Sequence, residues 1–249
     1  MPPTDNPQGA LSVRGGATDG AGPSRRSRGG RAARGDLLLL REQLLALGRR
    51  AEAGVADSIR AMLERDEALA RRVLEADSEL DGLELAVDET CGRLLALRHP
   101  VGELRFITTA LKIVVDLERI GDLAVNIAGC AIELSHDAEP ARMQDLARLA
   151  ALCHGQVRLA LAAFNTGDVH RAQQIIRNDE GVDARYHAFF NELIAFMIED
   201  PRHIRSGNGM LFIAKHLERI ADHAVNVAEM AIFLVRGRDV RHPRSRGLA

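Results

Sequence analysis

Two segments of the chain repeat one acidic spacing at positions one hundred residues apart. Each contains a Glu, an Asp and an Asn at intervals of four, and these are Glu118, Asp122 and Asn126, then Glu218, Asp222 and Asn226. In a helix with 3.6 residues per turn, this spacing stacks the three side chains on one face. Like charges at i and i+4 destabilise a helix. Because the chain carries the arrangement twice within apolar segments, we expect a positive group to face each row.

A second acidic pair precedes each row, and the two pairs are Asp77 with Asp81 and Asp179 with Asp183. In an antiparallel helical hairpin, residues equally far from the turn lie at the same height. Asp81 and Glu118 are equally far from the His99–Pro100 bond. Asp77 and Asp122 are also equally far from it, and the corresponding pairs of the second half are centred on the Asp200–Pro201 bond. Each half should therefore place four carboxylates at two adjacent levels of one helix pair.

Four neighbouring carboxylates cannot all remain ionised in a partly desolvated groove unless a cation or protons neutralise them. The spacing therefore predicts a metal site in each half. The predicted ligands are Asp77, Asp81, Glu118, Asp122 and Asn126 in the first half and Asp179, Asp183, Glu218, Asp222 and Asn226 in the second. Oxygen ligands favour Mg²⁺, Mn²⁺, Ca²⁺ or iron over copper, and more than one ion per site is compatible with this set.

An ion-pair network is the alternative to a metal. In that arrangement Arg119 and Arg219, which follow the two Glu residues directly, neutralise the acids. Arg119 can reach Asp122 at i,i+3, but a single guanidinium group offsets only part of the charge. His216 and His223 flank the second row and are predicted to be packing or surface residues, because their counterparts in the first half are Asp116 and Leu123.

The composition favours long helices. The chain has 249 residues, of which 46% are hydrophobic and only 3% aromatic, and Ala, Leu, Arg and Glu dominate. The formal charge of −2 hides a segregation of charge. Residues 1–35 contain six Arg against two Asp, and residues 236–249 contain five Arg against one Asp, so the part between them is strongly acidic. An acidic body suits cation binding and argues against a nucleic-acid surface.

Apolar residues at three- and four-residue spacing predict six helices, at about 36–64, 67–98, 101–135, 140–164, 169–199 and 202–235. Asp66 is a predicted N-cap, and Asp168, at the end of a predicted turn, lies 102 positions further along the chain. The predicted fold is all-α, with six long antiparallel helices in two tandem three-helix bundles related by an internal repeat of about 100 residues. The expected divisions are a disordered Arg/Gly-rich tail (1–35), the first bundle (36–136), the second bundle (137–236) and a basic C-terminal tail (237–249).

Cysteine usage and hydropathy indicate the compartment. Cys91, Cys130 and Cys153 lie far apart in apolar helical patterns, which favours buried thiols in a reduced cytoplasmic protein over a disulfide framework. No stretch approaches the roughly 18 uncharged apolar residues that a membrane-spanning helix needs. We therefore expect a soluble protein. Such a protein could still dock on a membrane complex.

The motif L-E-R-I-x-D-x-A-V-N occurs at Leu117–Asn126 and again at Leu217–Asn226. Each copy follows a D-x-x-x-D pair on the preceding helix. In this the chain resembles the PhoU family of phosphate-transport accessory and regulatory proteins, over about residues 36–236 and with both repeats in order. The first copy has Gly121, as is usual in the family, whereas the second has Ala221, a small-for-small change that leaves the acidic spacing intact.

The resemblance implies a cytoplasmic, often homodimeric and non-enzymatic protein that binds metal ions at these motifs. It implies action with the ATPase subunit of the phosphate ABC transporter and with a phosphate sensor histidine kinase, at the inner face of the membrane, to repress the phosphate-starvation response. The implied metal is Mg, Mn, Fe or Zn, in sites that can be multinuclear. Arg119 and Arg219 belong to the same motifs, and the resemblance gives them the role of orienting the carboxylates.

Two other classes of function remain open at this point. The same carboxylates could serve a metal-dependent enzyme, such as a ferritin-like oxidase or a phosphohydrolase. Against an enzyme, no Gly-rich loop precedes Lys112 or Lys215, the only two lysines, so a P-loop is absent. The Arg-rich ends could bind nucleic acid, but they lack aromatic stacking residues, so solvated tails are the simpler interpretation.

Overall fold

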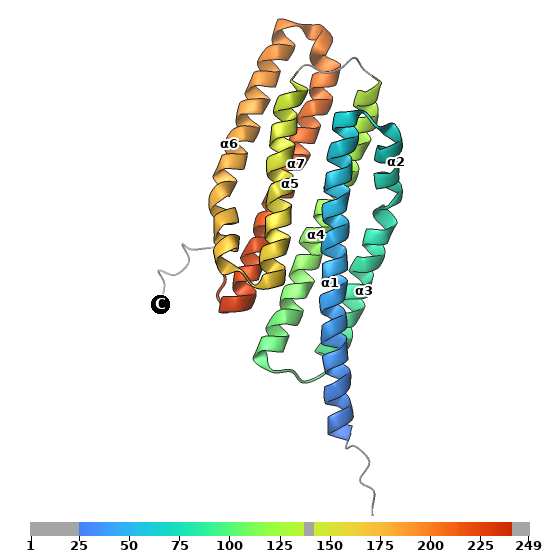
Figure 1. Ribbon diagram of the computed structural model, residues 1–249, viewed down its shortest axis with the longest axis vertical. Helices are drawn as coiled ribbons and strands as arrows, with labels where there is room; N and C mark the ends of the chain where they lie inside the picture. The colour runs from blue at the N-terminus through green and yellow to red at the C-terminus, as the bar shows by residue number, and fades with distance from the viewer. Residues whose placement is uncertain (1–24, 137–141, 241–249) are drawn as a thin grey trace, which may run out of the picture.

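The computed structural model describes residues 25–136 and 142–240, and every element in these ranges is helical (Figure 1). The elements are α1 (Arg25–Glu64), α2 (Glu67–Glu75), α3 (Asp77–Leu95), α4 (Val101–Ser135), α5 (Met143–Thr166), α6 (Val169–Glu199), the 3₁₀ turn η1 (Pro201–His203) and α7 (Ile204–Arg236). The predicted all-α fold is confirmed. Within the described ranges all six predicted helices are present, and the second is divided at Ala76 into α2 and α3. No described helix is both long and apolar enough to cross a membrane.

The predicted helix starts at Asp66 and Asp168 are confirmed by their hydrogen bonds. The side chain of Asp66 accepts from the backbone N–H of Leu69 at 2.9 Å, and Asp168 accepts from that of Arg171 at 3.0 Å. Each carboxylate thus satisfies a backbone donor that has no partner within its own helix. Gly167, in the left-handed region at φ 66°, ends α5 directly before Asp168.

Helix α1 starts earlier than predicted. It begins at Arg25, so the expected boundary between tail and bundle at residue 36 lies inside the helix. Elongating an existing helix adds one hydrogen bond per residue, and Ala and Arg are good helix formers. The part of α1 that packs against the core therefore allows the helix to continue back to Arg25, although this stretch contains glycines. Residues 1–24, 137–141 and 241–249, which contain the rest of the predicted tails and the predicted start of α5 at Pro140, lie outside the described residues.

The break at Ala76 has no counterpart in α6, which is continuous. At this break Arg50 of α1 contacts both sides of the joint. Its Nη2 donates to the carbonyl of Ala76 at 3.2 Å, and its Nε donates to Glu79 Oε2 at 3.0 Å. Because Arg50 donates a hydrogen bond to the carbonyl of Ala76 at the end of α2, it stabilises the break in the helix immediately before Asp77.

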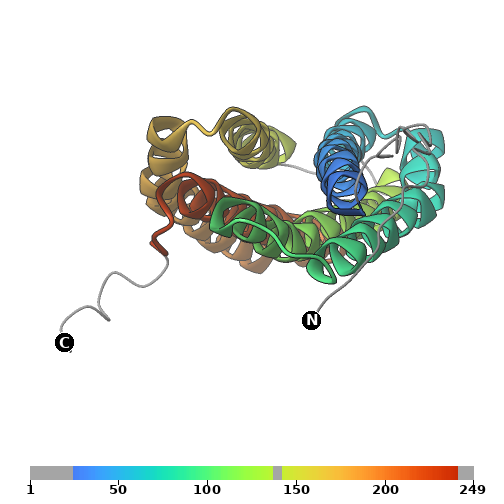
Figure 2. The same ribbon diagram turned by 90° about the horizontal axis from the view of Figure 1, so that it is seen from below.

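Helices α4 and α7 form the centre of the protein. They run in opposite directions and pack along much of their lengths (Figure 1). Seen along the helices, α1 and α5 lie on one side of this pair, with α2 and α3 at one edge and α6 at the other (Figure 2). The largest cluster of buried side chains draws on both halves, for example Leu47, Ile120, Leu149 and Ile220. The two repeated bundles therefore share one hydrophobic core.

Gly121 lets α3 approach α4 closely. A Cβ atom at this position would lie 2.7 Å from Cδ1 of Leu80, closer than carbon atoms pack. The second half has Ala221 and Val182 at the equivalent positions, and both are buried. In the second half Ala221 is larger than Gly121, and Val182 of α6 is smaller than Leu80.

This exchange of volumes leads to a stability prediction. Gly121→Ala is expected to lower the free energy of unfolding by roughly 1 kcal/mol, because overpacking costs more than the helix gains from alanine. In a Leu80→Val background, which reproduces the pair of the second half, most of the Gly121→Ala penalty should disappear. A double-mutant cycle from urea unfolding measures this coupling. Strictly additive effects would contradict the proposed contact.

Candidate metal sites

The second half brings three of the predicted carboxylates together. Asp183 on α6 and Glu218 and Asp222 on α7 each offer one oxygen, and these three atoms lie within 4.8 Å of one another. Asp183 and Glu218 are half-buried, whereas Asp222 is exposed. The α6/α7 hairpin therefore has the register that the distances from the Asp200–Pro201 bond predict.

Asp179 extends this group along α6. Its Oδ1 atom is buried and has no hydrogen-bond partner in the described part of the chain. Burial, reinforced by the charges of Asp183, Asp222 and Glu218, raises the pKa of Asp179 to about 6. A buried oxygen without a donor, beside three further carboxylates, is a position that a bound cation would satisfy.

Lys215 supplies a positive charge at the edge of this cluster. Its Nζ atom lies 2.6 Å from Glu218 Oε2, and this hydrogen bond raises the pKa of Lys215. Nevertheless the pKa of Asp222 is also raised, first by burial and then by the charges of Glu218 and Asp183, while Lys215 and His223 lower it. One ammonium group thus leaves the four carboxylates with excess negative charge.

The donor atoms fit a hard cation. Cys153 of α5 lies close enough to feel the charges of Glu218, Asp179 and Asp222, but burial is the main reason why its pKa rises to about 12. It is therefore a neutral thiol at physiological pH. All three cysteines are free, and Cys91 and Cys153 are buried, as predicted for structural thiols. The remaining donors are carboxylate oxygens, which suit Mg²⁺, Mn²⁺, Ca²⁺ or iron.

In the first half the structure brings Asp77 of α3 close to Asp122 of α4, as predicted. Burial raises the pKa of Asp77, and the charges of Asp81 and Asp122 raise it further. Burial likewise raises the pKa of Glu118 to about 7, and the neighbouring Asp122 contributes to this rise. Acidic residues of α3 and α4 thus form a cluster in the first half, called the first groove.

Arginine occupies part of this first groove. Arg119 Nη1 donates to Asp122 Oδ2 at 2.9 Å, and its Nε lies 3.4 Å from Glu118 Oε2. The ion-pair alternative is therefore partly realised in the first half. Among the described residues, only Asp183, Glu218 and Asp222 of the second half form a group of three potential metal ligands. Arg119 and its counterpart Arg219 are both exposed.

Glu84 belongs to the first groove but is absent from the sequence-based ligand set. Burial raises its pKa, as do the charges of Asp88 and Asp81, whereas Arg119 lowers it. Glu84 follows Asp81 by three residues, so both lie on the same face of α3. A search for acids at i,i+3 as well as i,i+4 would have included it.

The two asparagines lie differently from the carboxylates. Asn126 is exposed. Asn226 donates from Nδ2 to Asp116 Oδ1 at 2.9 Å, and His223 Nδ1 lies 2.9 Å from the same oxygen. These contacts join α7 to α4 across the boundary between the halves, in line with the packing role predicted for His223. Metal coordination by Asn126 and Asn226 stays a prediction.

The fold and its two grooves define a class of protein, namely an all-helical tandem repeat with a carboxylate-rich groove in each half. Comparison with known proteins gives the family. The model of the PhoU domain matches residues 44–131 and 146–231, and the chain belongs to the PhoU family. The family assignment predicted from the two motifs is thus confirmed.

Named relatives agree with this assignment. The chain is 40% identical over 205 residues to the phosphate-specific transport system accessory protein PhoU homolog of Pseudomonas putida, covering 82% of this chain and 80% of that protein. The homolog from Caulobacter vibrioides is 40% identical over 212 residues, covering 84% and 92% of the two chains. Both relatives are named as accessory proteins of phosphate transport, and the family is non-enzymatic.

Two crystal structures are similar to the whole folded part. PhoU from Pseudomonas aeruginosa superposes with a TM-score of 0.80 at 38% sequence identity, covering 82% of this chain and 99% of that one. The phosphate transport system regulatory protein PhoU from Streptococcus pneumoniae gives a TM-score of 0.77 at 29% identity, with 84% and 99% coverage. The arrangement of α1 to α7 is therefore that of solved members of the family.

Proposed function

We propose that the protein is a metal-binding cytoplasmic regulator of phosphate uptake and homeostasis. The observation that carries the metal part is the group formed by Asp183, Glu218 and Asp222, with the unpartnered buried oxygen of Asp179 beside it. The regulatory part rests on the relatives, whose names describe accessory and regulatory proteins of phosphate transport.

The residues that hold the metal in this proposal are those of the two acidic grooves. In the second half Asp179 and Asp183 bind from α6 while Glu218 and Asp222 bind from α7, and in the first half α3 and α4 supply the equivalent side chains. A bound Mg, Mn, Fe or Zn ion supplies positive charge, and four carboxylates allow more than one ion. The ligands come from two helices, so their shared cation ties each hairpin together and relieves the repulsion within it.

The partners follow from the same family role. The protein acts with the ATPase subunit of the phosphate ABC transporter and with the phosphate sensor histidine kinase. It does so as a homodimer at the inner face of the membrane, and it represses the phosphate-starvation response while phosphate is plentiful. Nucleic acid is not among its proposed partners, because the folded body is acidic.

Deletion of the protein tests this function. Without it, phosphate-starvation genes are expected to be expressed constitutively at high phosphate, and the full chain should restore repression. A chain carrying Glu218→Ala and Asp222→Ala is expected to restore it incompletely. Glu180→Ala is the matched control, because Glu180 is an exposed acid on α6 next to Asp179. Normal repression in the deletion strain would contradict the proposed function.

A further inference from the structure

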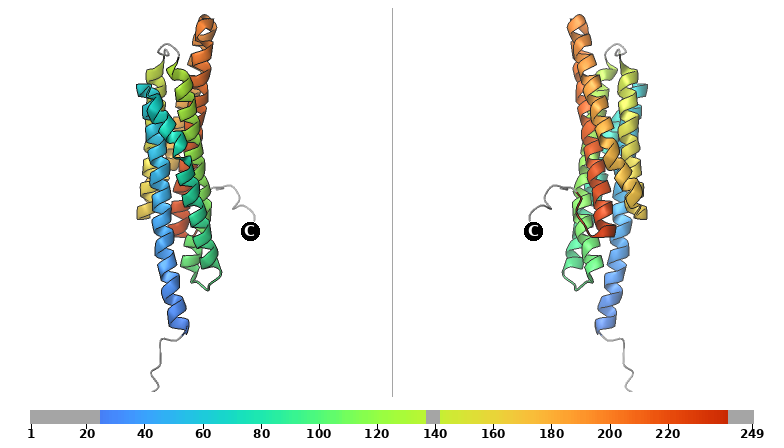
Figure 3. Two further views of the ribbon diagram at one scale, coloured as in Figure 1. Left: turned by 90° about the vertical axis from the view of Figure 1, so that its right-hand side faces the viewer. Right: turned by 90° about the vertical axis from the view of Figure 1, so that its left-hand side faces the viewer.

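One end of the protein exposes several large apolar side chains. The α3/α4 tip, defined as residues 95–104, connects two helices beside the start of α1 and lies opposite the α6/α7 connection (Figure 3). On this tip Val101 is 74% exposed, and Leu95 and Leu97 are exposed as well. Leu38 of the adjacent α1 is 65% exposed. Large apolar side chains exposed together at one end of a protein mark a surface that can bind a partner or a membrane.

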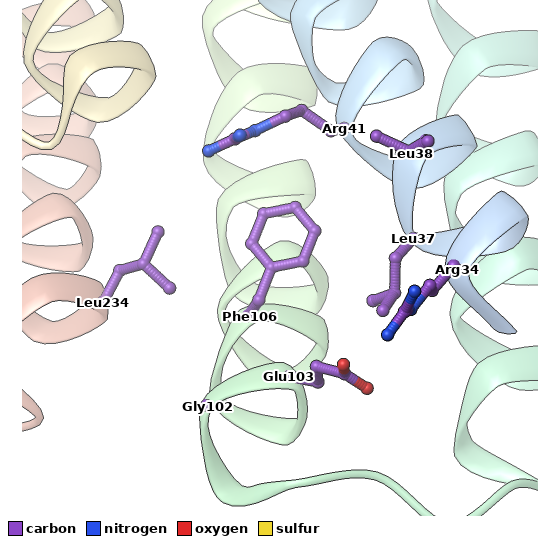
Figure 4. Close-up of a pocket in the computed structure, with 8 residues that line it drawn as sticks. All are labelled: Arg34, Leu37, Leu38, Arg41, Gly102, Glu103, Phe106 and Leu234. Atoms are coloured by element: carbon purple, nitrogen blue, oxygen red, sulfur yellow. The ribbon is translucent and has the colours of Figure 1, made fainter. Parts of the chain in front are cut away.

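An apolar pocket opens next to the tip. It has a volume of about 510 Å³ and lies between α1, the first turns of α4 and the end of α7. Leu37 and Phe106 face its interior from two helices, and Leu234 lies on its far side (Figure 4). The pocket thus continues the apolar surface of the tip inward.

Arginine side chains surround this apolar surface. Arg34 and Arg41 project from α1 at two levels of the pocket (Figure 4), and the Arg41 guanidinium lies 5.9 Å from the centre of the Phe106 ring. Arg98 is exposed on the tip itself. Long cationic side chains around an apolar tip are typical of surfaces that enter the boundary between headgroups and acyl chains.

Glu103 and Asp36, two acids near the tip, each contact a basic side chain. Glu103 Oε2 lies 2.8 Å from His99 Nδ1, and this hydrogen bond raises the pKa of His99. Asp36 lies 3.8 Å from Arg93. Arg93 offsets Asp36, and Arg34, Arg41 and Arg98 outnumber Glu103, so the tip and the adjoining part of α1 carry a net positive charge.

The α6/α7 connection, at the other end, offers a comparison within the same molecule. It exposes apolar residues too, since Ile198 is 75% and Ile204 is 53% exposed. Its charges are different, because Glu199 and Asp200 are balanced there by Arg202 and Arg205. Asp200 accepts hydrogen bonds from Arg202, and this contact lowers the pKa of Asp200 to about 2, so the two charges offset each other. Anionic lipids would be attracted more strongly to the first end than to the second.

We propose that the α3/α4 tip, together with Leu38 and the adjoining arginine-flanked pocket, binds directly to the surface of a bilayer that contains anionic phospholipid. Val101, Leu97 and Leu38 enter the boundary between headgroups and acyl chains. Arg34, Arg41 and Arg98 contact the lipid phosphates. In this orientation the long helices stand roughly perpendicular to the membrane surface, and the α6/α7 end points away from it. The inference does not rest on metal binding or on the transporter.

Vesicle co-sedimentation with the full purified chain tests the proposal, using phosphatidylcholine vesicles with and without phosphatidylglycerol. The chain is expected to bind the mixed vesicles, and binding should weaken as salt is added. Val101→Asp should reduce binding by at least about ten-fold. Each of Arg34→Gln and Arg41→Gln should reduce it by about five-fold.

Ile204→Asp is the matched control for Val101→Asp. Both residues are exposed, and each is the first residue of its helix, where an acid is favourable to the fold. Loss of binding in Val101→Asp with retention in Ile204→Asp supports the proposal. Equal losses, or no effect of Val101→Asp, would show adsorption through the basic ends of the chain and overturn it. Failure of the wild-type chain to bind mixed vesicles would also overturn it, as would a Val101→Asp effect confined to pulldown of a protein partner.

Discussion

Replacing Glu218 and Asp222 by alanine is expected to abolish metal binding in the second half of the protein while the fold is retained. Both side chains belong to the group whose oxygens lie within 4.8 Å of one another. Removing them leaves Asp179 and Asp183 on a single helix, without a ligand from α7. Metal analysis after equilibration with Mn²⁺ and dialysis measures the loss.

Metal should raise the Tm of the same variant by less than it raises the Tm of the wild type. A ligand present at a hundred times its dissociation constant stabilises a protein by about 2.7 kcal/mol. For a chain of this size that corresponds to a rise in Tm of roughly 5–10 °C, and the variant should lose the part contributed by its second half. Without metal, the variant is expected to be at least as stable as the wild type, because two repelling charges are gone. The control Glu180→Ala should retain wild-type metal content, and unchanged metal content in the double variant would contradict the site.

The metal-free protein is expected to become less stable as the pH rises from about 4 to about 7. The folded-state pKa of Glu118 is about 7 and that of Asp179 about 6, both above the ordinary values of these groups. The folded protein therefore holds protons that the unfolded chain has already released, and stability falls with pH over this interval. The stabilising effect is complete below the unfolded pKa values and is lost as the pH passes through the folded ones.

The expected loss is on the order of 1–2 kcal/mol, after allowance for solvent screening in these partly exposed grooves. Urea unfolding at a series of pH values in the presence of a chelator measures it. Glu118→Gln and Asp179→Asn should each flatten the profile, because an amide does not titrate. Added metal should restore stability at neutral pH and release protons on binding. A metal-free protein whose stability rises over the same interval would contradict the predicted charge repulsion.

The two halves are unequal versions of one site. In the first half Arg119 pairs with both Glu118 and Asp122, whereas in the second half Lys215 pairs with Glu218. A cation entering the first groove competes with a guanidinium group that spans two carboxylates. The second groove retains a buried oxygen of Asp179 without a partner. The second half is therefore the stronger candidate for metal binding in this chain.

The carboxylate grooves could be predicted from sequence because their geometry is set locally. Helix rise and the position of the turn determine which residues of a hairpin share a level, and the pairing of Asp77 with Asp122 needs no knowledge of the rest of the fold. The caps at Asp66 and Asp168 are local in the same sense. Such features depend on neighbouring residues and on a constant helical repeat.

Other features depend on contacts between distant segments and could not be predicted in this way. Arg50 of α1 stabilises the break at Ala76, where the sequence has neither Gly nor Pro. Asn226 matches the spacing of a ligand, yet its amide nitrogen donates to Asp116 on α4. The boundary between the halves brings these residues together, and spacing along one helix carries no information about it.

Anomalous X-ray scattering from crystals grown with Mn²⁺ tests the central claim most directly. We expect a peak between α6 and α7, bounded by Asp179, Asp183, Glu218 and Asp222, and no peak there in crystals of the Glu218→Ala, Asp222→Ala variant. Wild-type crystals with full Mn²⁺ exposure and no peak at this position, with Lys215 still bound to Glu218, would contradict the account.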